Sequence, residues 1–399
     1  MAKRSVKKIW EKAMPAAQFQ IMKKIIEAPS PIGYEGAMTY GVLKPYFDSF
    51  KLKGWGCHQF KSNSGIVFDT APDDKKALSI MVVGHADKIR LQVRSIGDDG
   101  KVWVNSDSFL PTTLIGHYVK LFVRDPKKPG KFKVIKGGTV EAIGAIHFAD
   151  PKLRSGTGGI KADQLYLELQ LHGPDRKKQV EKMGIRVGDP LLLDRPLSKG
   201  IADNTFIGPY LDNGLGCFVT AEIAKLIAKS GGLKKVRYLG AMATHEEIGR
   251  FGSRIQVQEL RPDILIAVDV NHDYAAAPGI GGERRPQNTM GAGFTIDHGA
   301  VTSIFLNDRI DAIARKHRIP LQDDVVGRDT GTDGMAAALA GIDSASASIG
   351  FPIRNMHTIS ECAHTGDVLA AIHVIYELIK DLDKAKFTKK NLKDSHLSL

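Results

Sequence analysis

The apolar run at residues 77–84, ALSIMVVG, constrains the fold of this chain more than any other segment. A strand with one face in water alternates polar and apolar residues. This run is continuous, which fits a strand buried on both faces. Further strands are predicted at residues 235–243, 264–270 and 344–350. We therefore expect a sheet whose inner strands are shielded from water.

Segments with helical periodicity accompany these strands. Residues 215–230, 303–317 and 367–381 each carry an apolar stripe, and a further helix is predicted before the breakers of residues 28–36, APSPIGYEG. Strands that alternate with helices indicate an α/β domain with a largely parallel sheet.

The pattern changes between residues 92 and 200. Short runs such as KVWVN and YVKLFV are separated by Gly, Pro and Asp, with one brief helix predicted near RKKQVEKMG. This pattern favours a small β-barrel or sandwich. Because 399 residues exceed what one compact core usually holds, we divide the chain into an α/β domain, residues 1–92 and 201–399, and a β-rich insertion, residues 93–200.

The net charge of +12, from 56 basic and 44 acidic residues, raises the question of nucleic-acid binding. The basic clusters are not interleaved with aromatic residues, and no helix-turn-helix, zinc-finger or RNP motif is present, so we expect a solvated basic surface. No apolar run is long enough to span a membrane. The basic N-terminus without an apolar signal core and the scattered Cys57, Cys217 and Cys362 favour a cytoplasmic protein.

Groups able to bind a metal stand at the ends of the predicted elements. His85 and Asp87 close one strand, Glu246 and Glu247 close another, and Asp269 ends a third. Ligands of open α/β sheets bind beyond the carboxyl ends of the strands, so these side chains are expected to meet. Two more candidates complete the set, Asp212 before a helix and His357 after a fourth strand.

Imidazoles combined with carboxylates suit Zn²⁺, Co²⁺ or Mn²⁺ better than Ca²⁺. The carboxylates are too many for one tetrahedral zinc, and two ions about 3.5–4 Å apart, bridged by one carboxylate, would neutralise them. Asp87 is placed to fix the tautomer of His85. One of the adjacent glutamates can face a metal while the other, as general base, faces the attacking water. The sequence therefore predicts a metal-assisted hydrolase.

These motifs resemble the cocatalytic di-zinc aminopeptidases of the tetrahedral (TET) type. This is the glutamyl aminopeptidase family, which includes members named endoglucanases and is related to the aspartyl aminopeptidases. The resemblance spans about residues 21–382 and is carried by SPIGYEG, GHAD, LDNGLGC, HEEIG, AVDV, GTDG and RNMHTISE, and in the insertion by IGHYVKL, AIGAIH and GIRVGDP.

The resemblance implies a phosphopeptidase-like mixed sheet flanked by helices, with an inserted β-barrel that mediates dimerisation and assembly into dodecamers. It implies an aminopeptidase that trims short peptides with two divalent ions per subunit, Zn²⁺ or Co²⁺, with Mn²⁺ as an alternative. Glu246 is then the general base, Asp87 orients His85, and Asp212 bridges the ions. The implied metal ligands are His85, Asp212, Glu247, Asp269 and His357.

Two residues depart from the family pattern. Gly214 stands where the family has Arg, which is expected to loosen the loop around Asp212, and His245 replaces a Gln, as in the aspartyl aminopeptidases. The preferred N-terminal residue therefore stays open. A deacylase or carboxypeptidase on the same scaffold is the alternative enzyme, and a nucleic-acid-binding scaffold is the non-enzymatic one.

Other candidates have simpler interpretations. His117, His147 and His172 lie in the insertion, where structural or surface roles are expected. Asp333, in GTDG, either orders a loop of the active site or forms a simple turn. The glycine-rich GIGG is not followed by a Lys or a helix of the phosphate-binding type, and no Gly-x-Ser-x-Gly motif is present.

Overall fold

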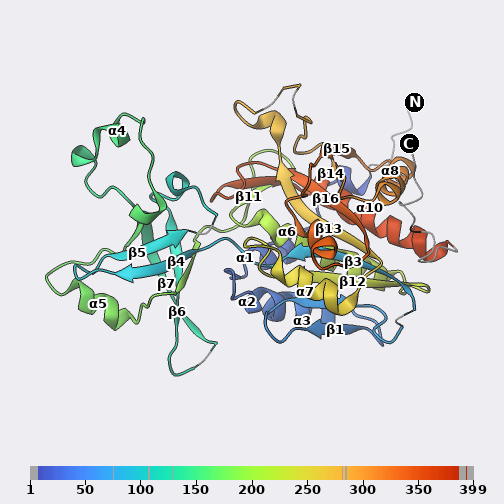
Figure 1. Ribbon diagram of the computed structural model, residues 1–399, viewed down its shortest axis with the longest axis horizontal. Coiled ribbons are helices and arrows are strands. Elements are labelled where there is room, and N and C mark those ends of the chain that lie inside the picture. Colours follow the sequence, from blue (N-terminus) through green and yellow to red (C-terminus); the bar gives the residue numbers. More distant parts are fainter. Residues whose placement is uncertain are drawn as a thin grey trace.

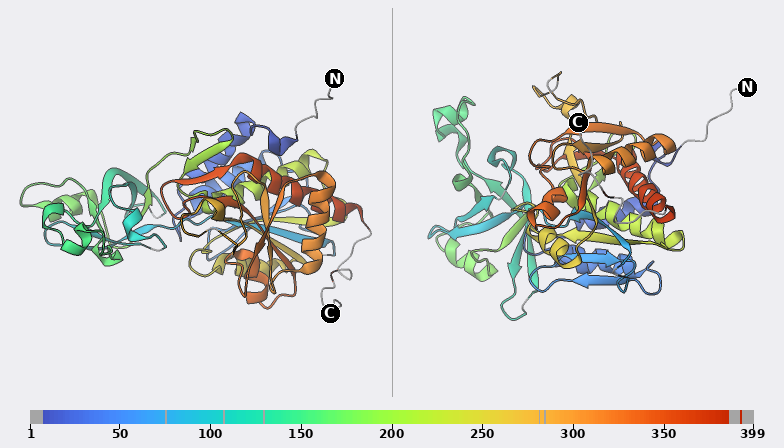
Figure 2. Two further views of the ribbon diagram at one scale, coloured as in Figure 1. Left: turned by 90° about the horizontal axis from the view of Figure 1, so that it is seen from above. Right: turned by 45° about the vertical axis from the view of Figure 1, so that its right-hand side comes forward.

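The computed structural model describes residues 8–74, 76–106, 108–128, 130–280, 282–283, 285–385 and 392. An eight-stranded sheet with helices on both faces forms the main body (Figure 1). A closed six-stranded barrel stands to one side, and Figure 2 shows this separation from two more directions. The predicted fold class, an α/β sheet with an inserted β-barrel, is confirmed.

The central sheet is parallel in its middle and antiparallel towards its edges. β3 runs parallel to β12 and β13, and β13 runs parallel to β16, whereas β2 and β14 are antiparallel to their inner neighbours. The strands, in their order across the sheet, are β1 (Gly56–Gln59), β2 (Ile66–Asp69), β12 (Val236–Ala243), β3 (Leu78–His85), β13 (Ile264–His272), β16 (Ala345–Ile353), β14 (Phe294–His298) and β15 (Leu321–Val325).

Every residue of β3 is buried, as the continuous apolar run predicted. Ile80 and Val82 belong to the hydrophobic core on one face of the sheet, and Met81 and Val83 to the core on the other. Residues that alternate along a strand point to opposite faces, so a predominantly apolar run contributes side chains to both cores.

Helices cover the two faces unequally. The larger core packs against α1 (Ala16–Glu27), α2 (Gly36–Met38), α3 (Lys44–Asp48), α6 (Leu211–Lys229), α8 (Ile304–His317) and α10 (Thr365–Lys384). The smaller core packs against α7 (Phe251–Leu260) and α9 (Ala336–Leu339). No helix in the described ranges has both the length and the hydropathy that a membrane crossing requires.

The barrel closes around its own hydrophobic core. Its strands, in order, are β4 (Leu91–Ile96), β5 (Val102–Ser106), β8 (Tyr166–Glu168), β7 (Phe132–Glu141), β6 (Tyr118–Arg124) and β9 (Pro190–Leu193). The helices α4 (Pro151–Arg154) and α5 (Arg176–Met183) lie between strands, and α5 matches the brief helix predicted there. Tyr210 and Ile359 of the main body join the barrel core, and the Tyr210 hydroxyl accepts a hydrogen bond from the Leu193 amide at 2.7 Å.

A small three-stranded sheet, which the sequence patterns did not predict, receives the chain where it leaves the barrel. Its strands are β10 (Ser198–Lys199), β11 (Thr205–Gly208) and β17 (Glu361–His364). Gly208 pairs with Glu361, so the segment that leads to Asp212 runs beside the segment that follows His357. Two candidate ligands that are distant in sequence therefore become neighbours.

The remaining short helical turns connect these elements. They are Ile9–Glu11, Thr39–Leu43, Pro111–Thr113, Ile146–Phe148, Ala162–Gln164, Tyr274–Ala276 and Asp333–Met335.

Candidate metal centre

The parallel strands bring the candidate ligands to one edge of the sheet. His85 ends β3 opposite Ala243 of β12, and Glu246 and Glu247 follow Ala243 directly along the chain. Ala267 of β13 pairs with Val83, so Asp269 stands level with His85. Asp212 reaches the same edge because the backbone angles of Asp212 depart from those of a helix within the first turn of α6.

A first ligand group contains His85, Asp212 and Asp269, all buried, with one ligand atom from each lying within 4.8 Å of the others. The His85 Nε2 atom lies 3.1 Å from Asp212 Oδ1 and 3.9 Å from Asp269 Oδ1. Three ligand atoms this close together could coordinate one metal ion.

A second ligand group contains Asp212, Glu247 and His357. The His357 Nε2 atom lies 3.1 Å from Asp212 Oδ2 and 3.7 Å from Glu247 Oε1. Asp212 thus offers one carboxylate oxygen to each group. This arrangement fits two ions bridged by a single carboxylate.

The two ligand groups bring the carboxylates of Asp212, Asp269 and Glu247 close together. Glu247 Oε1 is buried and has no hydrogen-bond partner among the described residues. Burial raises the pKa of Glu247 to about 10, and the neighbouring Asp212 carboxylate adds to the rise. Burial likewise raises the pKa of Asp269 well above its usual range. Divalent cations would allow these crowded carboxylates to ionise, so the residues fit a metal centre with nitrogen and oxygen ligands.

Asp212 differs from the other carboxylates. Its burial acts to raise its pKa, but the contacts with His357 and His85 outweigh burial and lower it below the usual range. The two imidazoles therefore favour the ionised form of the shared carboxylate.

Asp87 contacts both halves of the centre. Its backbone oxygen lies 3.1 Å from His85 Nδ1, closer than its carboxylate oxygen at 3.5 Å. The carboxylate instead accepts hydrogen bonds from the backbone amides of Glu246 and Glu247, both at 3.2 Å. Asp87 thus supports the glutamate pair as well as the imidazole that the sequence linked to it.

Glu246 lies beside the two ligand groups without belonging to either. Its Oε2 atom is 4.0 Å from His85 Nε2, and its Oε1 atom is 3.5 Å from Arg250 Nε. Arg250 in turn pairs with Asp329 at 2.8 Å. The side chain of Glu246 is 10% exposed and lines the pocket in front of the ligands, where it can reach a small molecule held there.

Glu361 is a site residue that the sequence analysis did not single out, although the quoted segment RNMHTISE ends with it. Its buried carboxylate accepts hydrogen bonds from the amides of His357 at 2.9 Å, Leu211 at 2.6 Å and Asp212 at 3.2 Å. One side chain therefore ties the two ligand-bearing segments together.

The two departures from the family pattern have different structural settings. A side chain at position 214 would meet the backbone and side chain of Ile26 in α1, with the nearest atom 3.0 Å from its Cβ. Gly214 thus permits close packing of α1 against α6, and the effect of this residue on the loop around Asp212 stays a prediction. His245 has a φ angle of 58° and joins neither ligand group.

The remaining candidates also lie outside the ligand groups found among the described residues. His117, His147 and His172 are on the barrel, where His147 and His172 are exposed. Asp333 is buried and accepts a hydrogen bond from Ser253 of α7, while its Oδ2 atom has no partner in the described part of the chain.

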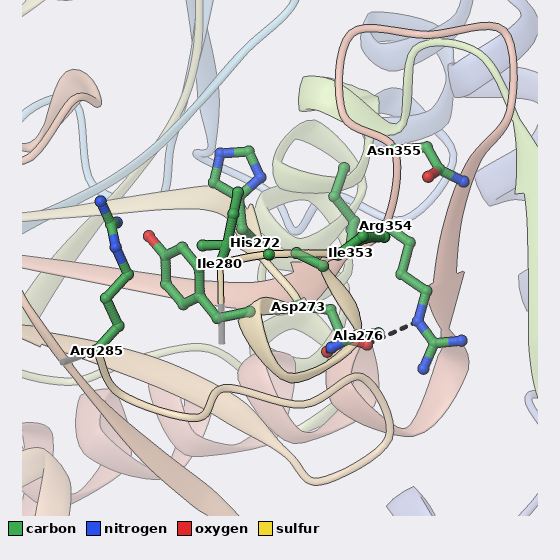
Figure 3. A pocket seen from close by; sticks show the side chains of 12 residues that line it. His272, Asp273, Ala276, Ile280, Arg285, Ile353, Arg354 and Asn355 are labelled. Atoms are coloured by element: carbon green, nitrogen blue, oxygen red, sulfur yellow. Dashed lines mark hydrogen bonds and ion pairs between the residues drawn. The ribbon is translucent and has the colours of Figure 1, made fainter. Parts of the chain in front are cut away.

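A pocket of about 290 Å³ opens in front of the ligand groups and extends over β13, β16, β14 and β15. A second hollow of about 870 Å³ adjoins it, and the two share His272 and Tyr274. Figure 3 shows this hollow, with Arg354 paired to Asp273 on one side and Arg285 on the other. The ligand groups are therefore open to molecules larger than water.

Comparisons with known proteins agree with this arrangement. The sequence profile of the M42 glutamyl aminopeptidases matches residues 65–374. The lysyl aminopeptidase of Pyrococcus furiosus is 29% identical over 381 residues, which cover 93% of this chain and 99% of that protein.

Solved structures share the fold. A TET aminopeptidase from a marine sediment archaeon of the Thaumarchaeota superposes with a TM-score of 0.82 at 22% identity, over 95% of this chain and 100% of the other. The TET1 peptidase of Pyrococcus horikoshii, described as able to assemble into a tetrahedron or a large octahedral shell, gives 0.72 at 19% identity, over 91% and 99%.

Proposed function

The chain belongs to the M42 glutamyl aminopeptidase family of metal-dependent peptide-bond hydrolases, and on this premise we propose that it removes N-terminal residues from short peptides with two divalent ions and Glu246 as general base. The observation that carries the proposal is the pair of ligand groups that share Asp212, since a single-ion site needs no shared carboxylate.

Five side chains would hold the two ions. His85 and Asp269 would hold one ion, Glu247 and His357 would hold the other, and Asp212 would offer one carboxylate oxygen to each. When bound, Zn²⁺, Co²⁺ or Mn²⁺ ions would polarise the scissile carbonyl and acidify the attacking water.

Glu246 moves the proton in this proposal. Its carboxylate takes the proton of the attacking water and delivers it to the leaving amine. Asp87 supports this role, because its hydrogen bonds to the amides of Glu246 and Glu247 fix the backbone from which both side chains extend.

The barrel, in the insertion at residues 93–200, is proposed as the dimerisation unit of a larger homo-oligomer. Phe148 on the barrel is 91% exposed, and Ile146 and Val187 are also largely exposed, which favours burial against another subunit. The assemblies described for the Pyrococcus horikoshii peptidase support this reading. Light scattering should give a mass well above 43.4 kDa, the mass of one chain; a monomer at micromolar concentration would contradict it.

Glu246→Gln tests the catalytic proposal. We expect the variant to keep two ions per chain, measured by elemental analysis, while kcat on unblocked peptides falls by about 10²–10⁴-fold. Glu259→Gln on the exposed part of α7 is the matched control and should retain activity. Full activity of Glu246→Gln would remove the general-base role. Equal cleavage of N-acetylated peptides would instead favour a deacylase or carboxypeptidase.

A further inference from the structure

The pocket in front of the ligand groups ends at a pair of aspartates that the metal centre does not use. Asp297 of β14 and Asp324 of β15 are direct partners across these parallel strands, and both line the pocket. They are only 8% and 6% exposed. Neighbouring carboxylates this deeply buried repel one another unless positive charge lies between them.

No Lys or Arg among the described residues forms an ion pair with either aspartate, and the imidazoles of His298 and His272 act on them without a hydrogen bond. Asp324 accepts hydrogen bonds from the Asn271 amide group at 3.2 Å and from the Val325 backbone at 2.8 Å, and Ser348 donates to Asp297. The adjacent His298 pairs with Asp323 at 2.9 Å, which is exposed. The aspartate pair thus has only neutral donors.

The same part of the pocket also contains an amide oxygen without a partner among the described residues. The Nδ2 group of Asn271 points to Thr295 Oγ1, 2.7 Å away, and to Asp324, which leaves its Oδ1 atom buried and without a partner among the described residues. Gly350 lines this part of the pocket, and a Cβ at this position would lie 2.8 Å from Thr295 Oγ1. Two carboxylates and an unpartnered amide oxygen in one part of the pocket fit a ligand with several N–H donors and positive charge.

We propose that this end of the pocket receives the side chain of the substrate's N-terminal residue, and that Asp297 and Asp324 select Lys or Arg. The inference rests on the proposed function, since the ligand groups at the other end of the pocket would hold the scissile bond. A Lys or Arg side chain reaches the carboxylates with its charged end and leaves its aliphatic part on Gly350. Asp and Glu side chains are repelled, and aliphatic ones leave the pair desolvated and unpaired.

The α-ammonium group that every unblocked peptide carries is the competing occupant of the aspartate pair. Substrates that share the α-ammonium but differ in the side chain separate the two. Lysine, Nε-acetyl-lysine, norleucine and leucine 7-amido-4-methylcoumarin derivatives form such a series, because acetylation removes the side-chain charge and keeps the α-ammonium.

The experiment measures kcat/KM of the metal-loaded protein and its variants on this series. For the unaltered protein, we expect lysine to exceed Nε-acetyl-lysine and norleucine by roughly 10- to 100-fold. Asp297→Asn and Asp324→Asn should each lower the lysine-to-norleucine ratio about tenfold or more. Asp323→Asn, the same charge change at the exposed neighbouring position, should leave the ratio unchanged.

The outcomes separate the competing readings. An unchanged ratio in both buried variants overturns the proposal, as does an equal fall on all substrates, which would place the α-ammonium at the aspartates. Loss of a third bound ion in Asp297→Asn would also overturn it. If no substrate is hydrolysed, the proposed function fails. Calorimetry with free L-lysine against L-norleucine still decides this inference, since selective binding of L-lysine that Asp297→Asn abolishes supports it and equal binding refutes it.

Discussion

The pocket contains two clusters of buried carboxylates that differ in their partners. The ligand groups combine carboxylates with His85 and His357, and they include a carboxylate oxygen without a hydrogen-bond donor among the described residues. Among the described residues, the pair of Asp297 and Asp324 accepts hydrogen bonds only from an amide, a hydroxyl and a backbone N–H, and the imidazoles of His298 and His272 act on it electrostatically without a hydrogen bond.

This difference shows how buried carboxylates at one edge of the sheet can serve two kinds of binding. Imidazole and carboxylate atoms that converge within 4.8 Å offer the close contacts of metal coordination. Two carboxylates on adjacent strands, with a neutral lining, offer charge without coordination geometry, which suits an organic cation. A substitution in one cluster should leave the binding function of the other cluster unchanged if the two clusters are separate.

Asp212→Asn should have the largest effect, because Asp212 belongs to both ligand groups. We expect bound metal to fall below two ions per chain and kcat/KM to fall by about 10⁴-fold or more on every substrate. Elemental analysis and kinetics check this, with the thermal stability of the metal-free protein as the control for folding. Two tightly bound ions in the variant would contradict the shared-carboxylate arrangement.

Glu361→Gln should have a smaller effect, which is limited to metal binding. Three backbone N–H groups donate to the Glu361 carboxylate, and the NH₂ group of Gln must face at least one of them. We expect metal affinity to fall roughly 10- to 100-fold. Competition with a chelator measures this loss.

The ratio of kcat/KM between lysine and norleucine substrates should not change in Glu361→Gln at saturating metal. A change in that ratio would show that Glu361 also shapes the aspartate pair, and that the two clusters are not separate.

The sequence predicted much of the main body because burial leaves a clear pattern. β3, β12, β13 and β16 all lie where apolar runs predicted strands, since strands buried on both faces are predominantly apolar. The helix predicted from residue 215 begins at Leu211 in the structure. The apolar periodicity starts only after Asp212 and Asn213, because the backbone angles of these two residues are not helical.

The sequence could not predict contacts that arise between distant segments. His85, Asp212, Asp269, Glu247 and His357 were selected for lying at the ends of elements, and they meet as the parallel sheet requires. Their roles as ligands remain proposals. The role of Glu361 could not be predicted, because its partners are backbone amides and no side-chain motif indicates such contacts. Asp297 and Asp324 escaped notice because their strands pair across a gap of 27 residues in sequence, from 297 to 324.

The acidity of Asp297 gives the smallest and most selective prediction. Burial raises the pKa of Asp297 to about 6, the Ser348 hydrogen bond acts against this rise, and the Asp324 carboxylate adds to it, with His298 the nearby basic group. Below that pKa the side chain is neutral and attracts a cation weakly, so preference for lysine should grow as pH increases. Between pH 5 and pH 7, the ionised fraction rises by about tenfold.

The ratio of kcat/KM for the lysine and norleucine substrates should therefore rise by several-fold up to about tenfold over this interval. Taking a ratio cancels the pH dependence of the metal centre, since both substrates use the same ligands and the same general base. Asp297→Asn removes the titrating group and should flatten the profile, whereas Asp323→Asn should keep its slope. A ratio that falls with increasing pH, or a slope that survives in Asp297→Asn, would show that the aspartate pair does not choose the side chain and that only the metal cluster governs the pocket.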